Sequence, residues 1–167
     1  MFNAGEYIVY GTSGVCLVAE VCTSPFDKRD TRLFYELRPV VGTAESVIYT
    51  PVENDRVPMR PVMSAEAVAT LLASIREIPI ITVTEERTRR ERYRTALATA
   101  IPAEYVAVIK TIRARRAEFM GTQRRIPEFE LECESLARRH LLAELSLVLG
   151  KTTQETANYI EEYAREA

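Results

Sequence analysis

Histidine and tryptophan are almost missing from this chain of 167 residues, which has a single histidine, His140, and no tryptophan. A metal ion in a protein normally needs three or four ligands, and only Glu144 stands one helical turn from His140. A structural or surface role is therefore expected for this histidine. The chain also lacks the Walker, dinucleotide-binding, Gly-x-Ser-x-Gly and His-Glu-x-x-His motifs. These absences predict a protein that is not an enzyme and that uses no cofactor, metal or small-molecule substrate.

Cysteine and long apolar runs are also scarce. Cys16, Cys22 and Cys133 are an odd number without Cys-x-x-Cys spacing, so they indicate neither a disulfide framework nor a zinc site. We expect them to be reduced and buried. No apolar run approaches the roughly 20 residues that span a bilayer, and the N-terminus lacks the basic-then-apolar pattern of a signal peptide. The sequence predicts a cytoplasmic protein without membrane contact.

Charge is distributed unevenly along the chain, although the formal net charge is only −2. Residues 1–63 carry 6 basic and 8 acidic groups, residues 64–126 carry 12 and 7, and residues 127–167 carry 4 and 9. A basic middle between two acidic ends is typical of a local contact with a polyanion, since neutralisation of phosphates by Lys and Arg dominates affinity for nucleic acids.

The first third of the chain has the pattern of short strands separated by turns. β-Branched and aromatic residues alternate with Gly and Pro, and Gly11–Gly14 is expected to be a turn that joins the first two strands. This turn is no phosphate cradle, because the Gly-Lys-Ser/Thr of such loops does not follow it. Four or five antiparallel strands in about 60 residues favour a strongly bent sheet or half-open barrel, often a binding module. The predicted strands are 5–10, 15–21, 32–39, 47–51 and, as an edge strand or an extended exit, 57–62.

The period of the apolar residues changes from 2 to 3.6 at Ser64, which marks the start of a helical region. Proline and glycine divide this region into about five helices that form a compact bundle. We therefore predict an α+β protein, with a β domain over residues 1–63 and a helical domain over residues 64–167. The expected helices run from Ser64 to before Pro79, over 84–100, from Pro102 to Gly121, from Pro127 to Gly150, and from Thr152 or Thr153 onward.

The stretch Glu85–Arg94 holds five arginines and one tyrosine and lies in the basic middle of the chain. Glu85 and Arg89, and Glu86 and Arg90, have the i,i+4 spacing of helical ion pairs. The remaining cations outnumber the acids around them, so charge alone leaves both nucleic-acid contact and simple pairing with neighbours open. A further acidic group is expected to form a solvated helix face: Glu128, Glu130, Glu132 and Glu134.

Four segments, taken in order, resemble the CarD/CdnL family of bacterial transcription regulators. Gly5–Val15 resembles the family's opening G-D/E-x-V-V-Y-x-x-x-G pattern, and Tyr49–Asn54 its Val-Pro-x-Glu-Asn signature. In the back half, Arg92–Leu97 resembles the R-R-Y-K-x-N-L/M helix, and Leu142–Ser146 the closing E-L/I-A/S helix. These motifs occur in the family's order and span nearly the whole chain.

The resemblance implies a protein with two docking surfaces. In the family, a Tudor-like N-terminal domain, shared with the transcription-repair coupling factor, binds the β subunit of RNA polymerase, partly by pairing of edge strands. The helical domain contacts promoter DNA near the upstream edge of the bubble, largely without sequence preference. The protein would then be associated with the nucleoid through RNA polymerase. The predicted polymerase-binding residues are Val47, Ile48, Tyr49, Thr50 and Pro51, and the predicted DNA-binding residues are Arg89, Arg90, Arg92, Tyr93, Arg94, Lys110, Arg113, Arg116, Arg124 and Arg125.

Two positions depart from the family pattern. Where the family usually has a tryptophan that wedges against a distorted base step, this chain has Arg89, and Glu91 replaces a basic residue. An arginine offers less apolar area for unstacking than an indole. The resemblance thus implies salt-dependent DNA binding with a weaker effect on open-complex stability than in relatives. The alternative is a protein-only polymerase adaptor whose basic helices pair with acidic neighbours.

Overall fold

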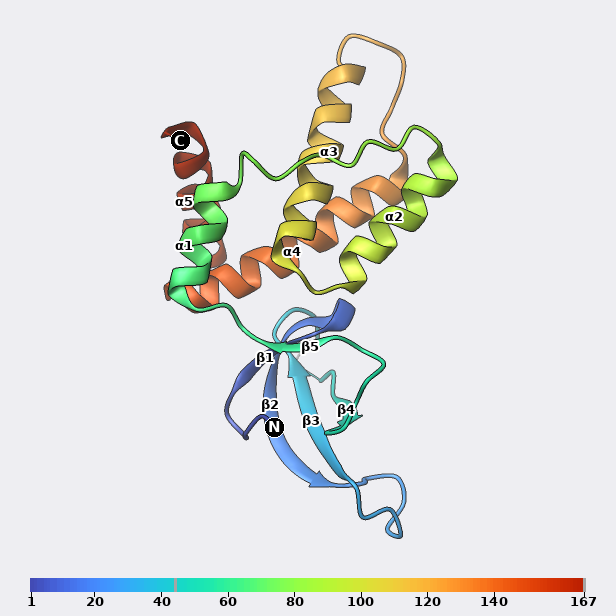
Figure 1. The fold of residues 1–167 in the computed structure, drawn as a ribbon, viewed down its shortest axis with the longest axis vertical. Helices are drawn as coiled ribbons and strands as arrows, with labels where there is room; N and C mark the ends of the chain where they lie inside the picture. Colours follow the sequence, from blue (N-terminus) through green and yellow to red (C-terminus); the bar gives the residue numbers. More distant parts are fainter. Residues whose placement is uncertain (44, 167) are drawn as a thin grey trace. The chain divides into compact units, whose positions relative to one another are not determined.

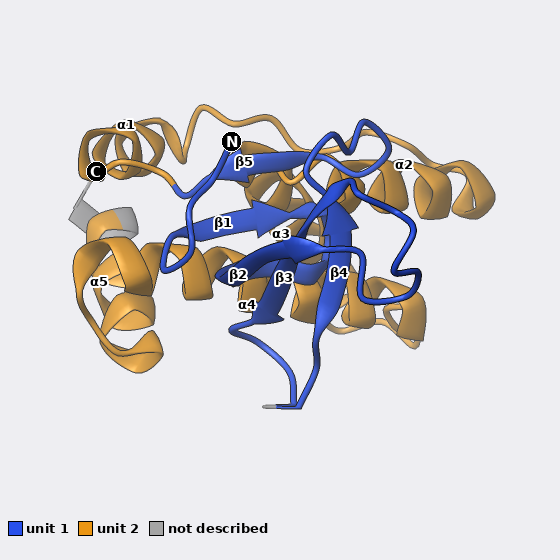
Figure 2. Ribbon diagram, turned by 90° about the horizontal axis from the view of Figure 1, so that it is seen from below, with its two compact units in different colours: residues 1–62 blue, residues 63–167 orange. Residues whose placement is uncertain are grey.

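The computed structural model describes residues 1–43 and 45–166, with side chains described as far as Tyr163. The chain divides into two compact units, residues 1–62 and 63–167. Figure 1 colours the ribbon by residue number, and Figure 2 gives each unit its own colour. In the described residues, the first unit is a five-stranded antiparallel sheet and the second contains five helices. The α+β fold class is confirmed.

The sheet of the first unit has the order β4-β3-β2-β1-β5, and every neighbouring pair is antiparallel. The stretch predicted as an edge strand or exit forms the short strand β5, which pairs with β1. β4 and β5 are therefore the two edges of the sheet. The strands are β1 (Tyr7–Tyr10), β2 (Gly14–Thr23), β3 (Leu33–Pro39), β4 (Ile48–Pro51) and β5 (Met59–Pro61).

The turn between β1 and β2 is a single turn of 3-10 helix, Gly11–Ser13. Gly11 has a positive φ of 44°, and its amide donates to the Pro58 carbonyl at 2.8 Å. A Cβ at this position would lie 2.5 Å from Cγ1 of Val57. Both the backbone conformation and the close approach of Val57 require glycine here.

A β-bulge bends the sheet in the middle of β2. Val18 faces Leu37 and Glu20 faces Glu36, so Ala19 is left without a partner on β3. Such a bulge bends its strand and increases the local twist, which matches the curved course of β2 in Figure 1. The bent sheet encloses a core of fully buried side chains, namely Ile8, Cys16, Val18, Tyr35 and Leu37.

The helices of the second unit begin and end close to the predicted positions. The Ser64 hydroxyl accepts from the Ala67 amide at 3.1 Å and caps α1, Pro102 opens α3, and Gly150 ends α4 in the left-handed conformation. α2 differs slightly, because its N-cap is Glu85 and not Thr84. The helices are α1 (Ala65–Ser74), α2 (Glu86–Ala98), α3 (Pro102–Phe119), α4 (Glu128–Leu149) and α5 (Thr153–Glu166).

The core of the helical unit lies where α2, α3 and α4 pack against one another and α1 adds two residues. Val106, Ile109 and Ile112 form an apolar stripe of α3 that faces this core, and His140 on α4 is also buried. No helix in the described part of the chain is long and apolar enough to cross a membrane. The principal core side chains are Val68, Leu72, Tyr93, Leu97, Tyr105, Val106, Ile109, Ile112, Ala137, Leu141 and Leu145.

Candidate functional site

β4 is an edge strand with one open side. It pairs with β3, and no other strand in the described residues pairs with it. The Val52 amide, one residue beyond β4, donates to the Leu33 carbonyl at 2.9 Å. This bond shows which positions along β4 are hydrogen-bonded to β3. Because hydrogen-bonded and non-hydrogen-bonded positions alternate in antiparallel pairs, the backbone groups of Tyr49 and Pro51 face away from β3.

The outward backbone groups of β4 are suited to receive one more strand. Tyr49 offers an N–H and a carbonyl, whereas Pro51 has no N–H and its carbonyl already accepts from the Asn54 amide at 3.1 Å. Because Pro51 sits at an outward position, its missing N–H removes no bond of the sheet. An extended segment of another protein can therefore add to this edge through main-chain hydrogen bonds, with specificity from the alternate side chains.

An aromatic and charged cluster flanks the open edge. The Tyr49 hydroxyl donates to Glu36 at 3.1 Å, and this hydrogen bond raises the pKa of the tyrosine. Arg38 holds the same carboxylate at 2.9 Å. The ring of Phe26 meets Tyr49 edge-on at 5.6 Å and is itself 76% exposed. Exposed aromatic surface beside an unpaired strand is typical of a binding site.

All five residues predicted to bind polymerase lie at this edge, with different roles. Val47 is exposed just before the strand, and Ile48 packs partly against the core of the sheet. Thr50 is buried and accepts a hydrogen bond from the Tyr10 hydroxyl at 3.2 Å. The side chains of Tyr49 and Pro51, on the other face, are therefore the ones that a partner strand would meet.

The predicted DNA contact by Arg89 is wrong in this structure, because the side chain is buried inside the helical unit. Its Nε donates to Glu130 at 3.0 Å, and both side chains are almost inaccessible, at 4% and 0% exposure. One Nη also donates to the Val83 and Thr84 carbonyls at 3.3 and 2.9 Å. The expected pair with Glu85 does not form, since that carboxylate accepts from Thr88 instead. Arg89 therefore joins α2 and the preceding connector to α4.

Tyr93 also needs correction, because it is a core residue with no exposed surface. Its ring packs against Phe129 at 6.4 Å between centroids, and burial raises the pKa of its hydroxyl. The i,i+4 spacing places Tyr93 one turn after Arg89 on the same inward face of α2. Neither residue can present a surface to DNA in this conformation.

Of the four acidic residues of α4 that the sequence predicts to form a solvated face, Glu128 and Glu132 are exposed, but the prediction is wrong for the other two. Glu130 and Glu134 are buried, and they bind arginines of α3. Glu130 accepts from Arg115 at 2.9 Å in addition to the α2 arginine, and Glu134 accepts from Arg116 at 2.6 Å with Arg113 at 3.9 Å. Residues at i,i+4 share one face of a helix, and here that face packs against α3.

Lys110 is a further correction to the predicted DNA-binding set. Its ammonium group donates to the carbonyls of Ile75, Arg76 and Ile78 at 3.0, 2.9 and 2.5 Å. These carbonyls lie at and just beyond the C-terminal end of α1, where helical carbonyls lack partners within the helix. Three acceptors use all three donors of the ammonium group, so Lys110 fixes α1 against α3.

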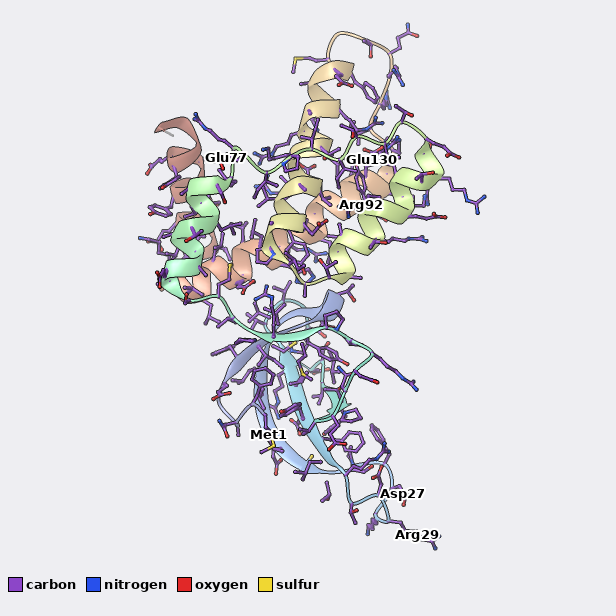
Figure 3. The ribbon with its side chains drawn as sticks, in the orientation of Figure 1. Met1, Asp27, Arg29, Glu77, Arg92 and Glu130 are labelled. Atoms are coloured by element: carbon purple, nitrogen blue, oxygen red, sulfur yellow. The ribbon has the colours of Figure 1, made fainter. Side chains whose placement is uncertain are left out.

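Other predicted arginines remain at the surface of α2. Arg94 is exposed and has no ion pair among the described residues. Arg90 stacks over Phe129 at 4.2 Å and makes the predicted pair with Glu86 at 3.4 Å. Arg92, labelled in Figure 3, is partly engaged, because it meets Glu104 at 2.9 Å.

The loop between α3 and α4 carries a second group of exposed cations. Arg124 lies over the ring of Phe119 at 4.5 Å, and Arg125 is exposed without an ion pair in the described part of the chain. Sequence reasoning missed two α4 arginines, Arg138 and Arg139, because the acidic balance of residues 127–167 hid them. Arginine is rarely buried without a partner, which could have indicated a surface position; Arg139 is exposed and Arg138 is partly exposed.

A small antiparallel sheet with an open edge strand and aromatic side chains beside it defines a module for docking to another protein. Residues 2–63 match the family model of the CarD-like/TRCF RID domain, so the first unit is a domain of this family. The match spans 62 of the 167 residues and confirms the resemblance for this first unit. Comparison with curated proteins finds no match. The domain family indicates a role in transcription through interaction with RNA polymerase.

Proposed function

We propose that this protein is a non-catalytic transcription regulator that bridges RNA polymerase and promoter DNA. The first unit binds the β subunit through β4, and the helical unit contacts DNA near the upstream edge of the bubble. The observation that carries the proposal is the open β4 edge within a CarD-like/TRCF RID domain. Contacts that exist only with one promoter state shift the balance between closed and open complexes without any chemistry.

If a partner strand adds to β4, two substitutions at Tyr49 separate the contribution of the main-chain hydrogen bond from that of the side chain. Tyr49→Pro removes the outward N–H, whereas Tyr49→Ala keeps this donor and removes only the ring. Since the Tyr49 N–H points away from β3, the proline leaves the bonds of the sheet in place. We expect Tyr49→Pro to abolish capture of RNA polymerase by the full chain and Tyr49→Ala to weaken it partly.

Thermal unfolding of both variants serves as the control for folding, and the purified β subunit replaces the whole enzyme in a second capture. Undiminished capture by a folded Tyr49→Pro variant would exclude strand addition. Capture of polymerase without capture of the isolated β subunit would indicate that the protein contacts another subunit.

Exposed guanidinium groups support the DNA-binding half of the proposal. Arg94 and Arg125 have no ion pair among the described residues, and Arg124 is held only by stacking on Phe119. Guanidinium groups at a surface neutralise phosphates irrespective of base sequence, and each neutralised phosphate releases counterions. Binding to duplex DNA should therefore weaken steeply with salt and vary little with sequence.

A salt titration with matched arginines tests this half. Arg94→Ala and Arg125→Ala should each lower the slope of log affinity against log salt by about 0.9, the value for one phosphate contact. Arg92→Ala is the matched control, because its guanidinium is already engaged by Glu104. The open-complex lifetime measured with the Arg94→Ala, Arg125→Ala double variant should return to that of polymerase alone. Equal slopes for all variants would contradict the assignment of these arginines.

A protein-only polymerase adaptor is the second candidate, and a specific observation favours it. Many cations of the basic middle are held by internal partners: Arg89 and Arg115 by Glu130, Arg116 by Glu134, and Lys110 by three carbonyls. The charge available to a polyanion is therefore smaller than the sequence implies. Undetectable DNA binding at low salt, together with intact capture of polymerase, would establish this second function.

A further inference from the structure

The helical unit contains an apolar cavity of about 220 Å³ between four helices. α3 and α4 supply one side, and the end of α1 and the middle of α5 supply the other. Figure 1 shows these four helices around one region of the unit, apart from α2. The apolar walls are formed by Ile75, Val106, Ile109, Leu141, Leu142 and Ile160.

The size and chemistry of the cavity fit an apolar group larger than a solvent molecule. A cavity of about 150 Å³ lined by aliphatic side chains stays dry and binds benzene. The present cavity is larger and partly open to solvent, and the aliphatic side chains of its walls offer no polar partners to ordered water. A ring or a short hydrocarbon chain therefore gains more from this space than water does.

The edge of the cavity is positively charged. Arg76, Arg113 and Arg138 line it, opposed by one carboxylate, Glu161. Arg138 has no ion pair among the described residues, and Arg113 lies 3.9 Å from the Glu134 carboxylate, at the limit of a salt bridge. Both guanidinium groups can thus accept a further anionic partner.

Lys110 adds to the positive potential at the wall. It lines the same cavity, and its only polar partners among the described side chains and backbone are the three neutral carbonyls at the end of α1. Neutral carbonyls satisfy the donors of the ammonium group without cancelling its charge. The cavity is therefore apolar inside and cationic around it.

We infer that this cavity is a binding site for a small amphipathic carboxylate, separate from the polymerase and DNA surfaces proposed above. The hydrocarbon part occupies the space between α1, α3, α4 and α5, and the carboxylate is held at the edge by Arg138 with Arg113. Guanidinium groups bind carboxylates through paired N–H donors, which fixes the orientation of the ligand. Specificity would rest on this combination, since a few polar groups orient a ligand whose body is held by apolar contact.

The experiment uses the full chain and octanoate as the probe, with binding measured by isothermal titration calorimetry and by chemical-shift changes. Octanoate should bind saturably at a single site. Octanol, which has the same chain without the charge, should bind at least roughly tenfold more weakly, since a charge-assisted hydrogen bond is lost. The shift changes should map to Ala157, Ile160 and Val106 and not to the sheet.

Two variants and one matched control complete the test. Ala157→Leu fills the cavity from α5 and should abolish binding, while Arg138→Gln keeps the packing and should raise the Kd of octanoate roughly tenfold. Arg139→Gln, the next residue of α4, does not line the cavity and should leave the Kd unchanged. Thermal unfolding shows whether each variant is folded.

Equal affinity for octanol and octanoate, the same loss of affinity in Arg139→Gln as in Arg138→Gln, or binding retained by a folded Ala157→Leu variant would overturn the proposal. So would the lack of saturable binding by the wild type. Because none of these measurements involves polymerase or DNA, the outcome is independent of the proposed role in transcription.

Discussion

The guanidinium group of Arg89 and the carboxylate of Glu130 form a 3.0 Å ion pair that is almost completely buried between α2 and α4. Glu130, which Figure 3 labels, has no exposed surface. The pair stands at the position where the sequence predicts a surface arginine that replaces a DNA-wedging tryptophan. Because the pair is buried, Arg89 contributes to the stability of the helical unit and not to recognition of DNA.

Removal of Arg89 should destabilise the helical unit strongly. Arg89→Met leaves the Glu130 carboxylate buried with only Arg115, and breaking a buried pair from one side costs about 3–5 kcal/mol. Urea unfolding followed by helical circular dichroism measures this loss. The double variant Arg89→Met, Glu130→Met should recover part of this loss, because the buried carboxylate is gone, although Arg115 then loses its partner. A loss below about 1 kcal/mol in the single variant would contradict the buried pair.

Arg89→Trp should act in the same way and should not create a DNA wedge. The position faces the interior, so an indole there replaces a buried guanidinium and is not offered to a base step. We expect lower stability and no increase in the lifetime of the open complex formed with RNA polymerase. A longer lifetime with unchanged stability would show that this side chain reaches the surface.

Lys110→Met should lower stability while leaving DNA binding unchanged. The substitution keeps the length of the side chain but leaves the Ile75, Arg76 and Ile78 carbonyls without their shared donor. Hydrogen bonds to a charged group contribute about 1.5–3 kcal/mol each, and part of this is regained from water because the residue is half-exposed. Arg113→Met, on the same helix and more exposed, is the control and should change stability little. A smaller slope of log DNA affinity against log salt for Lys110→Met would show that Lys110 contacts DNA.

The close contact between Gly11 and Val57 predicts a rescue experiment. Gly11→Ala should destabilise the sheet by about 2–4 kcal/mol, from the positive φ and from the clash of the new Cβ with Val57 Cγ1. Thermal unfolding of the double variant Gly11→Ala, Val57→Ala should show partial recovery, because the clashing methyl group is gone and only the backbone strain remains. Additive losses in the double variant would mean that the two side chains do not meet.

The buried thiol of Cys16 should make the sheet sensitive to alkali. Burial raises the pKa of Cys16 from 9.0 to about 11, so the unfolded chain loses this proton at a lower pH than the folded one. Stability is then fully present below pH 9.0 and falls as pH rises toward about 11, by about 3 kcal/mol in all. Unfolding of wild type and Cys16→Ala across this range measures the effect. The variant should lack this component of the pH dependence, and parallel curves would contradict it.

The strands and helices were predictable because their signals are local. Alternation of apolar residues placed β1 to β4, and Ser64, Pro102 and Gly150 marked helix ends through the chemistry of their own side chains and backbone. The edge position of β4 followed from the family resemblance and agrees with the sheet order. The weakest of the predicted strands, 57–62, is also the shortest in the structure, with only Met59–Pro61 paired.

The partners of the charged residues were not predictable, because ion pairs across helices depend on packing that no local spacing encodes. Arg89 has a glutamate at i−4 on its own helix, yet it binds Glu130, which is 41 residues away in sequence. The alternating glutamates at the start of α4 have the pattern of a solvated helix face. In the structure, the face that carries Glu130 and Glu134 packs against α3. Local pairing rules held only where the side chains are exposed, as in Glu86 and Arg90.

The missing N–H of Pro51 has a consequence for association between copies of this protein. If two β4 edges met around a two-fold axis, each would present the same proline to the other, and the symmetric ladder would lose the Pro51 bond twice. A partner strand with its own sequence can instead end its pairing before Pro51 and lose nothing. Exposed sheet edges can pair with one another and so cause soluble proteins to aggregate. The proline in β4 therefore disfavours homodimers and fibres, while the edge stays open to a strand of another protein.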